Sequence, residues 1–410
     1  MNDYRPAAPA ERKYVLIPPD AAHPGMGQTA PETSVPAGQP VQPPAGAPYP
    51  APQYVPVQPN PASAPQYVPV PPSPAPQYAP AQPYPPVRAR KQVPPAIRGL
   101  RRAANTAGFA AAASPLLQIV CSYLVTYAVA FLGAISGFGR YFSQNDWLLL
   151  VTAIVYPVSF ILPVLLLRMT SRQPMRELLS LRRPGALYMT AVPMTVLGTV
   201  MLGVFLSDLI ARLTSLFGVV SSSDLVQPAS NGFFDLVFYF FLMAVMPAIL
   251  EEFLFRGAML SALRPYGDGF AILTTAAFFS IIHCNLGQAP SAFLTGLVLG
   301  YAAVVSGSIW PSVLAHFINN ALALALGMLC DALPSASANL ANLIIDAAYL
   351  LVGAAGCVLL FRKSRPQLRL RGGAGRFPAG KLLGTTLSRP GVIVFLAVCM
   401  LMTAMSFHAS

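Results

Sequence analysis

Charged side chains are scarce in this chain, and acidic ones are the rarest. Of its 410 residues, 55% are hydrophobic and 10% are charged, with 14 Asp and Glu against 26 Lys and Arg. Soluble domains carry about 25% charged residues. The deficit argues against an ordinary water-soluble fold and indicates that lipid surrounds most of the folded chain.

Cysteine motifs are absent as well, because none of the five cysteines belongs to a CxxC pair. They lie in or beside apolar runs, at Cys121, Cys284, Cys330, Cys357 and Cys399. We expect them to be small buried residues rather than a disulfide framework or a metal site. The formal charge of +12 arises from short basic clusters between apolar runs. Membrane topology explains such clusters better than nucleic acid does, so we expect no nucleic-acid partner.

The first 95 residues contain no apolar run that would form a core, and no short basic start followed by an apolar stretch. They hold most of the 43 prolines, and the tetrad Ala-Pro-Gln-Tyr occurs three times. We expect residues 1–95 to be a disordered, partly polyproline-II cytoplasmic tail without a signal peptide, followed by a basic juxtamembrane segment at 96–113. The tail is either a spacer or a docking segment for a partner.

Apolar runs dominate the remainder, which we expect to be a transmembrane domain over 114–410. A spanning helix needs roughly 20 mostly apolar residues. Candidate runs cover 114–137, 147–167, 186–209, 233–260, 270–286, 290–306, 308–329, 342–361 and 391–408. The sequence therefore predicts an all-α fold, a polytopic transmembrane helix bundle of eight or nine spans.

Basic residues test this count, because they collect on the cytoplasmic side of a membrane. With nine alternating spans, the clusters before the first span, after the second, after the fourth and after the eighth all fall on one side. Only Arg140 and Arg212 fall on the other. We therefore expect a multi-pass protein of the cell membrane with a cytoplasmic N-terminus and an external C-terminus.

Ionisable and amide side chains inside membrane spans are costly and usually functional. Here they gather in three of the predicted spans. Glu252 and Arg256 are four residues apart, in the order that favours an ion pair, and His316 and Asn320 share a helix face by the same spacing. Pro247 precedes the acidic pair and is expected to kink its helix beside a polar cavity.

Each of these groups has an ordinary explanation when it is taken alone. The neighbouring acids Glu251 and Glu252 would be an interfacial charge cluster, and His283 or Asn320 would bond between helices. Taken together, a carboxylate, two histidines and an amide on three polar-bearing helices are typical of a hydrolytic site.

Three motifs carry a family resemblance, namely Glu251-Glu252-x-x-x-Arg256, Phe279-x-x-x-His283 and His316-x-x-x-Asn320. They are similar to the EExxxR, FxxxH and HxxxN motifs of the CPBP intramembrane proteases, a family that includes CAAX prenyl endopeptidases and bacteriocin-processing, Abi-type proteins. The chain resembles this family over roughly 233–330. The resemblance implies an intramembrane endopeptidase that acts on membrane-associated peptides or proteins, and we expect a bacterial source.

The resemblance also implies roles for these side chains. Glu251 is the expected general base, with His283 sharing the attacking water. His316 and Asn320 are the expected donors to the oxyanion. The residues expected to support them are Glu252, Arg256 and Phe279.

The metal requirement stays open at this point. Zinc would be held by Glu251, His283 and His316. The spacing is not that of an HExxH motif, so we favour a metal-free mechanism over a zinc enzyme.

Two other function classes fit a polytopic chain. A transporter or channel also uses carboxylates within the membrane, but the two halves show no convincing repeat and the polar groups gather in one half. A non-catalytic scaffold would act through its Pro-rich tail.

Overall fold

The computed structural model describes residues 93–136, 144–216, 219–221, 233–364, 369–373, 377–405 and 407–409. The Pro-rich tail therefore lies outside the described residues, apart from the last few positions of 1–95. Arg140 lies outside them too.

The described chain is helical apart from one small strand pair, which agrees with the predicted all-α fold. The first half comprises α1 (Pro95–Ser136), α2 (Gln144–Ser171), α3 (Met175–Leu178) and α4 (Ala186–Ser215). Next comes a rod built from α5 (Phe233–Phe240), η2 (Phe241–Val245), α6 (Met246–Glu252), η3 (Phe253–Met259), α7 (Leu260–Leu263) and η4 (Arg264–Tyr266). The rest comprises α8 (Asp268–Ile281), α9 (Ala289–Ser306), α10 (Trp310–Asp331), α11 (Ser335–Ser364), α12 (Ala379–Leu387) and α13 (Pro390–Met405). Strands β1 (Val219–Ser221) and β2 (Phe407–Ala409) pair antiparallel, with Val219 opposite Ala409.

Seven helices within the described residues are long and apolar enough to cross a membrane, and an eighth span results if α12 and α13 count as one. This agrees with the lower of the two predicted counts. The predicted span at 270–286 corresponds to α8, which has 14 residues. At 1.5 Å per residue it is about 21 Å long, which is too short for a hydrocarbon core of about 30 Å. The predicted last span corresponds to α13, which bends by 72° from α12.

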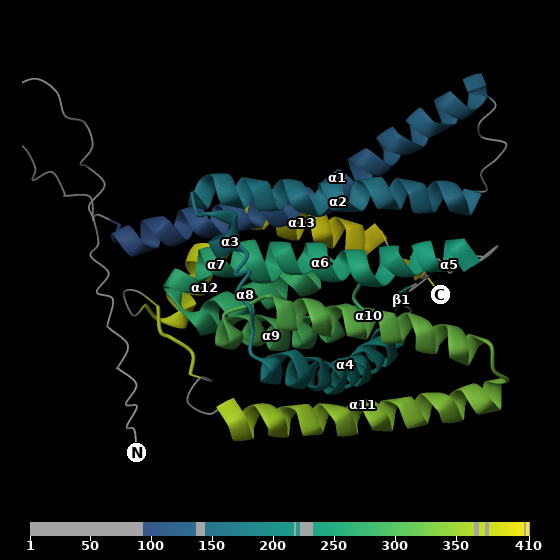
Figure 1. The fold of residues 1–410 in the computed structure, drawn as a ribbon. Coiled ribbons are helices and arrows are strands. Elements are labelled where there is room, and N and C mark those ends of the chain that lie inside the picture. Colours follow the sequence, from purple (N-terminus) through teal and green to yellow (C-terminus); the bar gives the residue numbers. More distant parts are fainter. Residues whose placement is uncertain are drawn as a thin grey trace, which may run out of the picture. The chain divides into compact units, whose positions relative to one another are not determined.

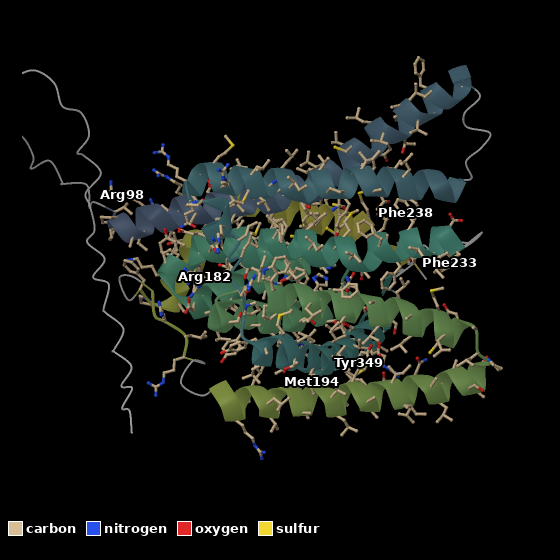
Figure 2. The ribbon with its side chains drawn as sticks, in the orientation of Figure 1. Arg98, Arg182, Met194, Phe233, Phe238 and Tyr349 are labelled. Carbon is tan, nitrogen blue, oxygen red and sulfur yellow. The ribbon has the colours of Figure 1, made fainter. Side chains whose placement is uncertain are left out.

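The long helices run alongside one another (Figure 1). Arg98 at the start of α1 and Arg182 after α3 lie at one end of the bundle, and Phe233 at the start of α5 lies at the other (Figure 2). Both arginines belong to basic clusters that are predicted to lie on the same side of the membrane.

The rod from 233 to 266 alternates α-helical and π-helical turns. The π-helical segment η2 ends just before Met246 and Pro247. Proline has no backbone N–H to donate and its ring clashes with the carbonyl one turn earlier, so a widened turn at this point relieves both effects. A second π-helical segment, η3, follows Glu252. The irregular turns bracket the segment that carries the two acids.

The close contact between α4 and α11 depends on glycine. Gly198 of α4 faces Gly353 of α11, and a Cβ added at Gly353 would lie 2.4 Å from the Gly198 Cα. Small residues let helix backbones approach closely in lipid, where burial of apolar surface gives little drive for association.

Candidate active site

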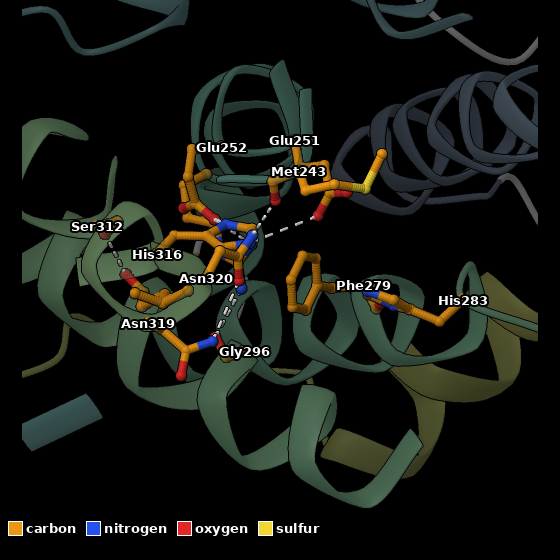
Figure 3. Close-up of polar contacts among 12 residues, drawn as sticks. Met243, Glu251, Glu252, Phe279, His283, Gly296, Ser312, His316, Asn319 and Asn320 are labelled. Carbon is orange, nitrogen blue, oxygen red and sulfur yellow. Dashed lines mark hydrogen bonds and ion pairs between the residues drawn. The ribbon is translucent and has the colours of Figure 1, made fainter. Parts of the chain in front are cut away.

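Four ionisable side chains from two elements of the rod and one facing helix meet inside the bundle. Figure 3 labels three of them, Glu251, Glu252 and His316. Glu251 and Glu252 end α6, Arg256 lies in η3 and His316 lies in α10. Their exposed fractions are 7% for Glu251, 0% for Glu252, 1% for Arg256 and 7% for His316. Charged groups at this depth are stable only when they are paired, so the contacts between them define the site.

Glu252 of α6 is bonded to both η3 and α10 through one carboxylate oxygen. Its Oε1 accepts a hydrogen bond from Arg256 Nη1 at 2.8 Å and another from His316 Nδ1 at 3.0 Å. The ion pair expected from the i,i+4 spacing is therefore confirmed. The guanidinium carbon of Arg256 also lies 4.0 Å from the centroid of the Phe279 ring, a cation–π contact with α8. These contacts fix the orientation of the His316 ring.

Glu251 faces the other nitrogen of the same ring. Its Oε2 lies 4.0 Å from His316 Nε2, which is too long for a direct hydrogen bond. Because Nδ1 donates to Glu252, Nε2 of the neutral imidazole is an acceptor. Two acceptors at this separation can share one bridging water. The Oε1 atom of Glu251 accepts a hydrogen bond from the hydroxyl of Tyr156 in α2.

His283 lies on the far side of Phe279 from this cluster (Figure 3). The Phe279 ring is edge-on to both imidazoles, with its centroid 5.1 Å from that of His283 and 5.8 Å from that of His316. The Nδ1 atom of His283 donates to the Phe279 carbonyl at 2.7 Å. The structure therefore does not bring His283 into the group formed by Glu251 and His316.

Asn320 follows His316 by one turn of α10 and is partly exposed. Its Nδ2 makes a long hydrogen bond of 3.4 Å to the Met243 carbonyl. The neighbouring Asn319 donates to the Asn320 side-chain oxygen at 3.2 Å. Because the bond to Met243 is weak, the Asn320 amide is a donor that another acceptor can capture.

A comparison with family models gives one match. Residues 233–322 match the model described as type II CAAX prenyl endopeptidase Rce1-like. This segment is therefore similar to that family, and residues 233–322 are called the Rce1-like domain below. The matched region holds all three sequence motifs and every residue of the cluster described above except Tyr156. Neither a curated protein nor a solved structure matches the chain significantly.

The Rce1-like domain does not assemble the zinc ligands that were the alternative in the sequence. Within the described residues, no group of three or more His, Cys, Asp and Glu side chains is placed to hold a metal ion. Glu251 and His316 are close, but the Phe279 ring separates His283 from His316 (Figure 3). The donor set therefore does not fit a metal centre, and we derive no step through one.

One site residue, Tyr156, was missed by the sequence analysis. It lies in α2, outside the Rce1-like domain, and 95 residues separate it from its partner Glu251. A tyrosine within an apolar run is compatible with ordinary packing, so no motif or spacing singles it out. Its role follows only from the contact between α2 and α6.

An apolar pocket of about 320 Å³ borders the Rce1-like site. It is lined by Met189, Val245, Ala248, Ile249, Trp310, Val313, Leu314 and Phe317. Ala248 precedes Glu252 by one helical turn, and Phe317 follows His316 directly. The pocket and the ionisable side chains therefore share two helices, α6 and α10.

Proposed function

We propose that this protein is an intramembrane endopeptidase that hydrolyses peptide bonds in membrane-associated peptides or proteins. One observation carries the proposal: Glu251 Oε2 lies 4.0 Å from His316 Nε2 within a buried polar site on apolar helices. A carboxylate and an imidazole at this separation are suited to hold and activate a single water. The match of 233–322 to a protease family supports the same chemistry.

In the proposed reaction, a water donates one hydrogen to Glu251 Oε2 and the other to His316 Nε2. Its lone pairs then point away from both acceptors, toward the carbonyl carbon of the substrate. Glu251 takes a proton as the new C–O bond forms, and later gives it to the departing amine. Asn320 donates to the oxyanion, an interaction for which single donors are typically worth about 10²–10³ in rate.

This division of labour changes one role relative to the sequence-based hypothesis. There the water lay between Glu251 and His283, and His316 served the oxyanion. The position of the His316 ring beside Glu251 supports a role for it at the water instead. We retain His283 as a proposed site residue because of its FxxxH motif, which belongs to the family pattern.

We propose that the mechanism is metal-free. The hydrogen bond between His316 Nδ1 and Glu252 orients the ring with or without a metal, so this choice depends on the position of His283. The separation of His283 from His316 by Phe279 supports this choice over a zinc site.

The apolar pocket supports a substrate with a large apolar group next to the cleaved bond. Pockets that bind small ligands usually measure about 300–1,000 Å³ and have mostly apolar walls. A prenyl chain, as the family description implies for its CAAX members, and a large apolar side chain are both suited to it.

We further propose that the basic end of the bundle faces the cytoplasm of a bacterial cell, by the positive-inside rule. This places the N-terminal tail in the cytoplasm. A protease-sensitive tag at residue 1 should then be protected in intact spheroplasts and cut after lysis. Cleavage of the tag in intact spheroplasts would reverse the orientation.

Comparative peptidomics of membranes that contain the wild-type protein or Glu251→Gln tests the activity. Glutamine preserves the shape of the side chain but cannot take the proton from water, so we expect specific cleavage products to disappear. Glu177→Gln is the matched control, since Glu177 is exposed in α3. Identical peptide profiles for wild type and Glu251→Gln would reject the protease and favour transport or a scaffold.

A further inference from the structure

We infer that Tyr156 is the positioning residue of Glu251, and that it determines which carboxylate oxygen of Glu251 acts as the base. The inference rests on the proposed function, because it assigns a role within that reaction. Tyr156 lies outside the region that matches the protease family, so neither the family motifs nor their spacing point to it.

The contact is a hydrogen bond from the Tyr156 hydroxyl to Glu251 Oε1. Hydrogen bonds to a charged acceptor are roughly twice as strong as those between neutral groups. The tyrosine itself is well held. Its ring packs against Phe160 at a centroid distance of 4.8 Å.

The two oxygens of the Glu251 carboxylate thereby become different. Oε1 is occupied by the tyrosine, whereas Oε2 is buried and has no hydrogen-bond partner among the described residues. It is Oε2 that faces His316 Nε2. Rotation of the carboxylate about its terminal bond would break the bond to Tyr156. The hydroxyl therefore keeps Oε2 directed at the place where the water would be held.

The neighbouring acid shows that this arrangement is specific to Glu251. Glu252 receives its hydrogen bonds from Arg256 and His316, and both donors lie within the Rce1-like domain. Glu251 receives its hydrogen bond from a different helix, α2. Consequently, α2 supplies a part of the site that the matched domain does not contain.

Tyr156→Phe tests the inference, because it removes only the hydroxyl and keeps the ring against Phe160. The matched control is Ser159→Ala, which removes a buried hydroxyl of the same helix that donates to the Tyr156 backbone carbonyl and not to Glu251. The probe is an internally quenched peptide that spans a cleavage junction found in wild-type membranes and absent from Glu251→Gln membranes. Misplacement of a reacting group by about 1 Å can cost 10²-fold in rate. We expect kcat to fall by about 10- to 100-fold in Tyr156→Phe with KM nearly unchanged, and Ser159→Ala to behave as wild type.

A second measurement reports on the contact without any substrate. Thermal unfolding in detergent is compared for wild type, Tyr156→Phe, Glu251→Leu and the double variant. Tyr156→Phe should lower the unfolding temperature of the wild-type protein but not that of Glu251→Leu, which has no acceptor for the hydroxyl. Equal shifts in both backgrounds would overturn the contact.

The kinetic outcomes separate the two proposals. If Tyr156→Phe has the wild-type kcat while Glu251→Gln is inactive, the role of Tyr156 is overturned and the proposed protease activity is supported. The same holds if Ser159→Ala loses as much turnover as Tyr156→Phe, since helix packing would then explain both losses. If no cleavage junction depends on Glu251, the proposed function itself fails, and the role of Tyr156 fails with it.

Discussion

His316 Nδ1 lies 3.0 Å from Glu252 Oε1, although 64 residues separate the two along the chain. This bond connects α10 to the rod that carries both acids and leaves the opposite ring nitrogen facing Glu251. Through it, the orientation of the imidazole depends on an acid that has no proposed part in bond cleavage. Glu252 thus serves two purposes, pairing Arg256 and aligning His316.

Arg256→Ala should reduce the folded yield and the thermal stability of the protein. The substitution leaves the fully buried Glu252 without its cationic partner, and loss of one member of a buried pair costs about 3–5 kcal/mol. Unfolding in detergent, followed by size-exclusion chromatography, measures the effect. The control is Arg176→Ala, because Arg176 is exposed in α3. A double variant, Arg256→Met with Glu252→Gln, should regain part of the folded yield. An unchanged folded yield in Arg256→Ala would contradict the ion pair.

His316→Ala should lower turnover by about 10²-fold or more, since it removes one of the two groups proposed to hold the water. Met328→Ala in the same helix should stay near the wild-type rate, because Met328 is exposed and lies about three helical turns beyond His316. Turnover of the Glu251-dependent peptide measures both. Comparable losses in the two variants would indicate a general disturbance of α10 rather than a role for the imidazole.

Exhaustive dialysis against a chelator should leave turnover unchanged. The physical reason is that Phe279 separates the imidazoles that a zinc site would have to bring together. Elemental analysis of the active protein should accordingly find less than one zinc per chain. Loss of activity on chelation, with recovery on addition of Zn²⁺, would replace the metal-free mechanism with a zinc enzyme.

Gly353→Ala should destabilise the bundle by about 1–3 kcal/mol, the usual cost of forcing extra volume into a packed interface. The added Cβ would meet the Gly198 Cα at 2.4 Å and push α11 from α4. Gly327→Ala is the matched control, because a Cβ at that helical position meets nothing within 4 Å. Thermal unfolding of the two variants compares them directly, and equal stability would mean that the helices do not approach as closely as described.

Local features of the site could be predicted from the sequence because they depend on helix geometry alone. The Glu252–Arg256 pair needs only a spacing of four residues in one helix, and the helices themselves need only apolar runs of sufficient length. The span count was less certain. The apolar run at 270–286 has the composition of a span, but the helix within it, α8, ends at Ile281 and a turn follows.

Contacts between helices could not be predicted in the same way. The motif placed His283 beside Glu251, but its Nδ1 bonds to the Phe279 carbonyl of its own helix and the ring lies beyond Phe279. A side chain with a free carbonyl one turn earlier has a local alternative that competes with any partner across the bundle. Spacing alone does not decide between the two.

The sequence by itself determined that the chain is a helical membrane protein. It also determined which acids, histidines and amides lie within apolar helices. Those properties follow from composition and from the period of the helix. Only the tertiary structure decided that His316 rather than His283 faces Glu251, and that Tyr156 from α2 occupies one oxygen of that acid. The reason is that both facts depend on how helices distant in sequence are rotated against each other, and side-chain packing sets that rotation.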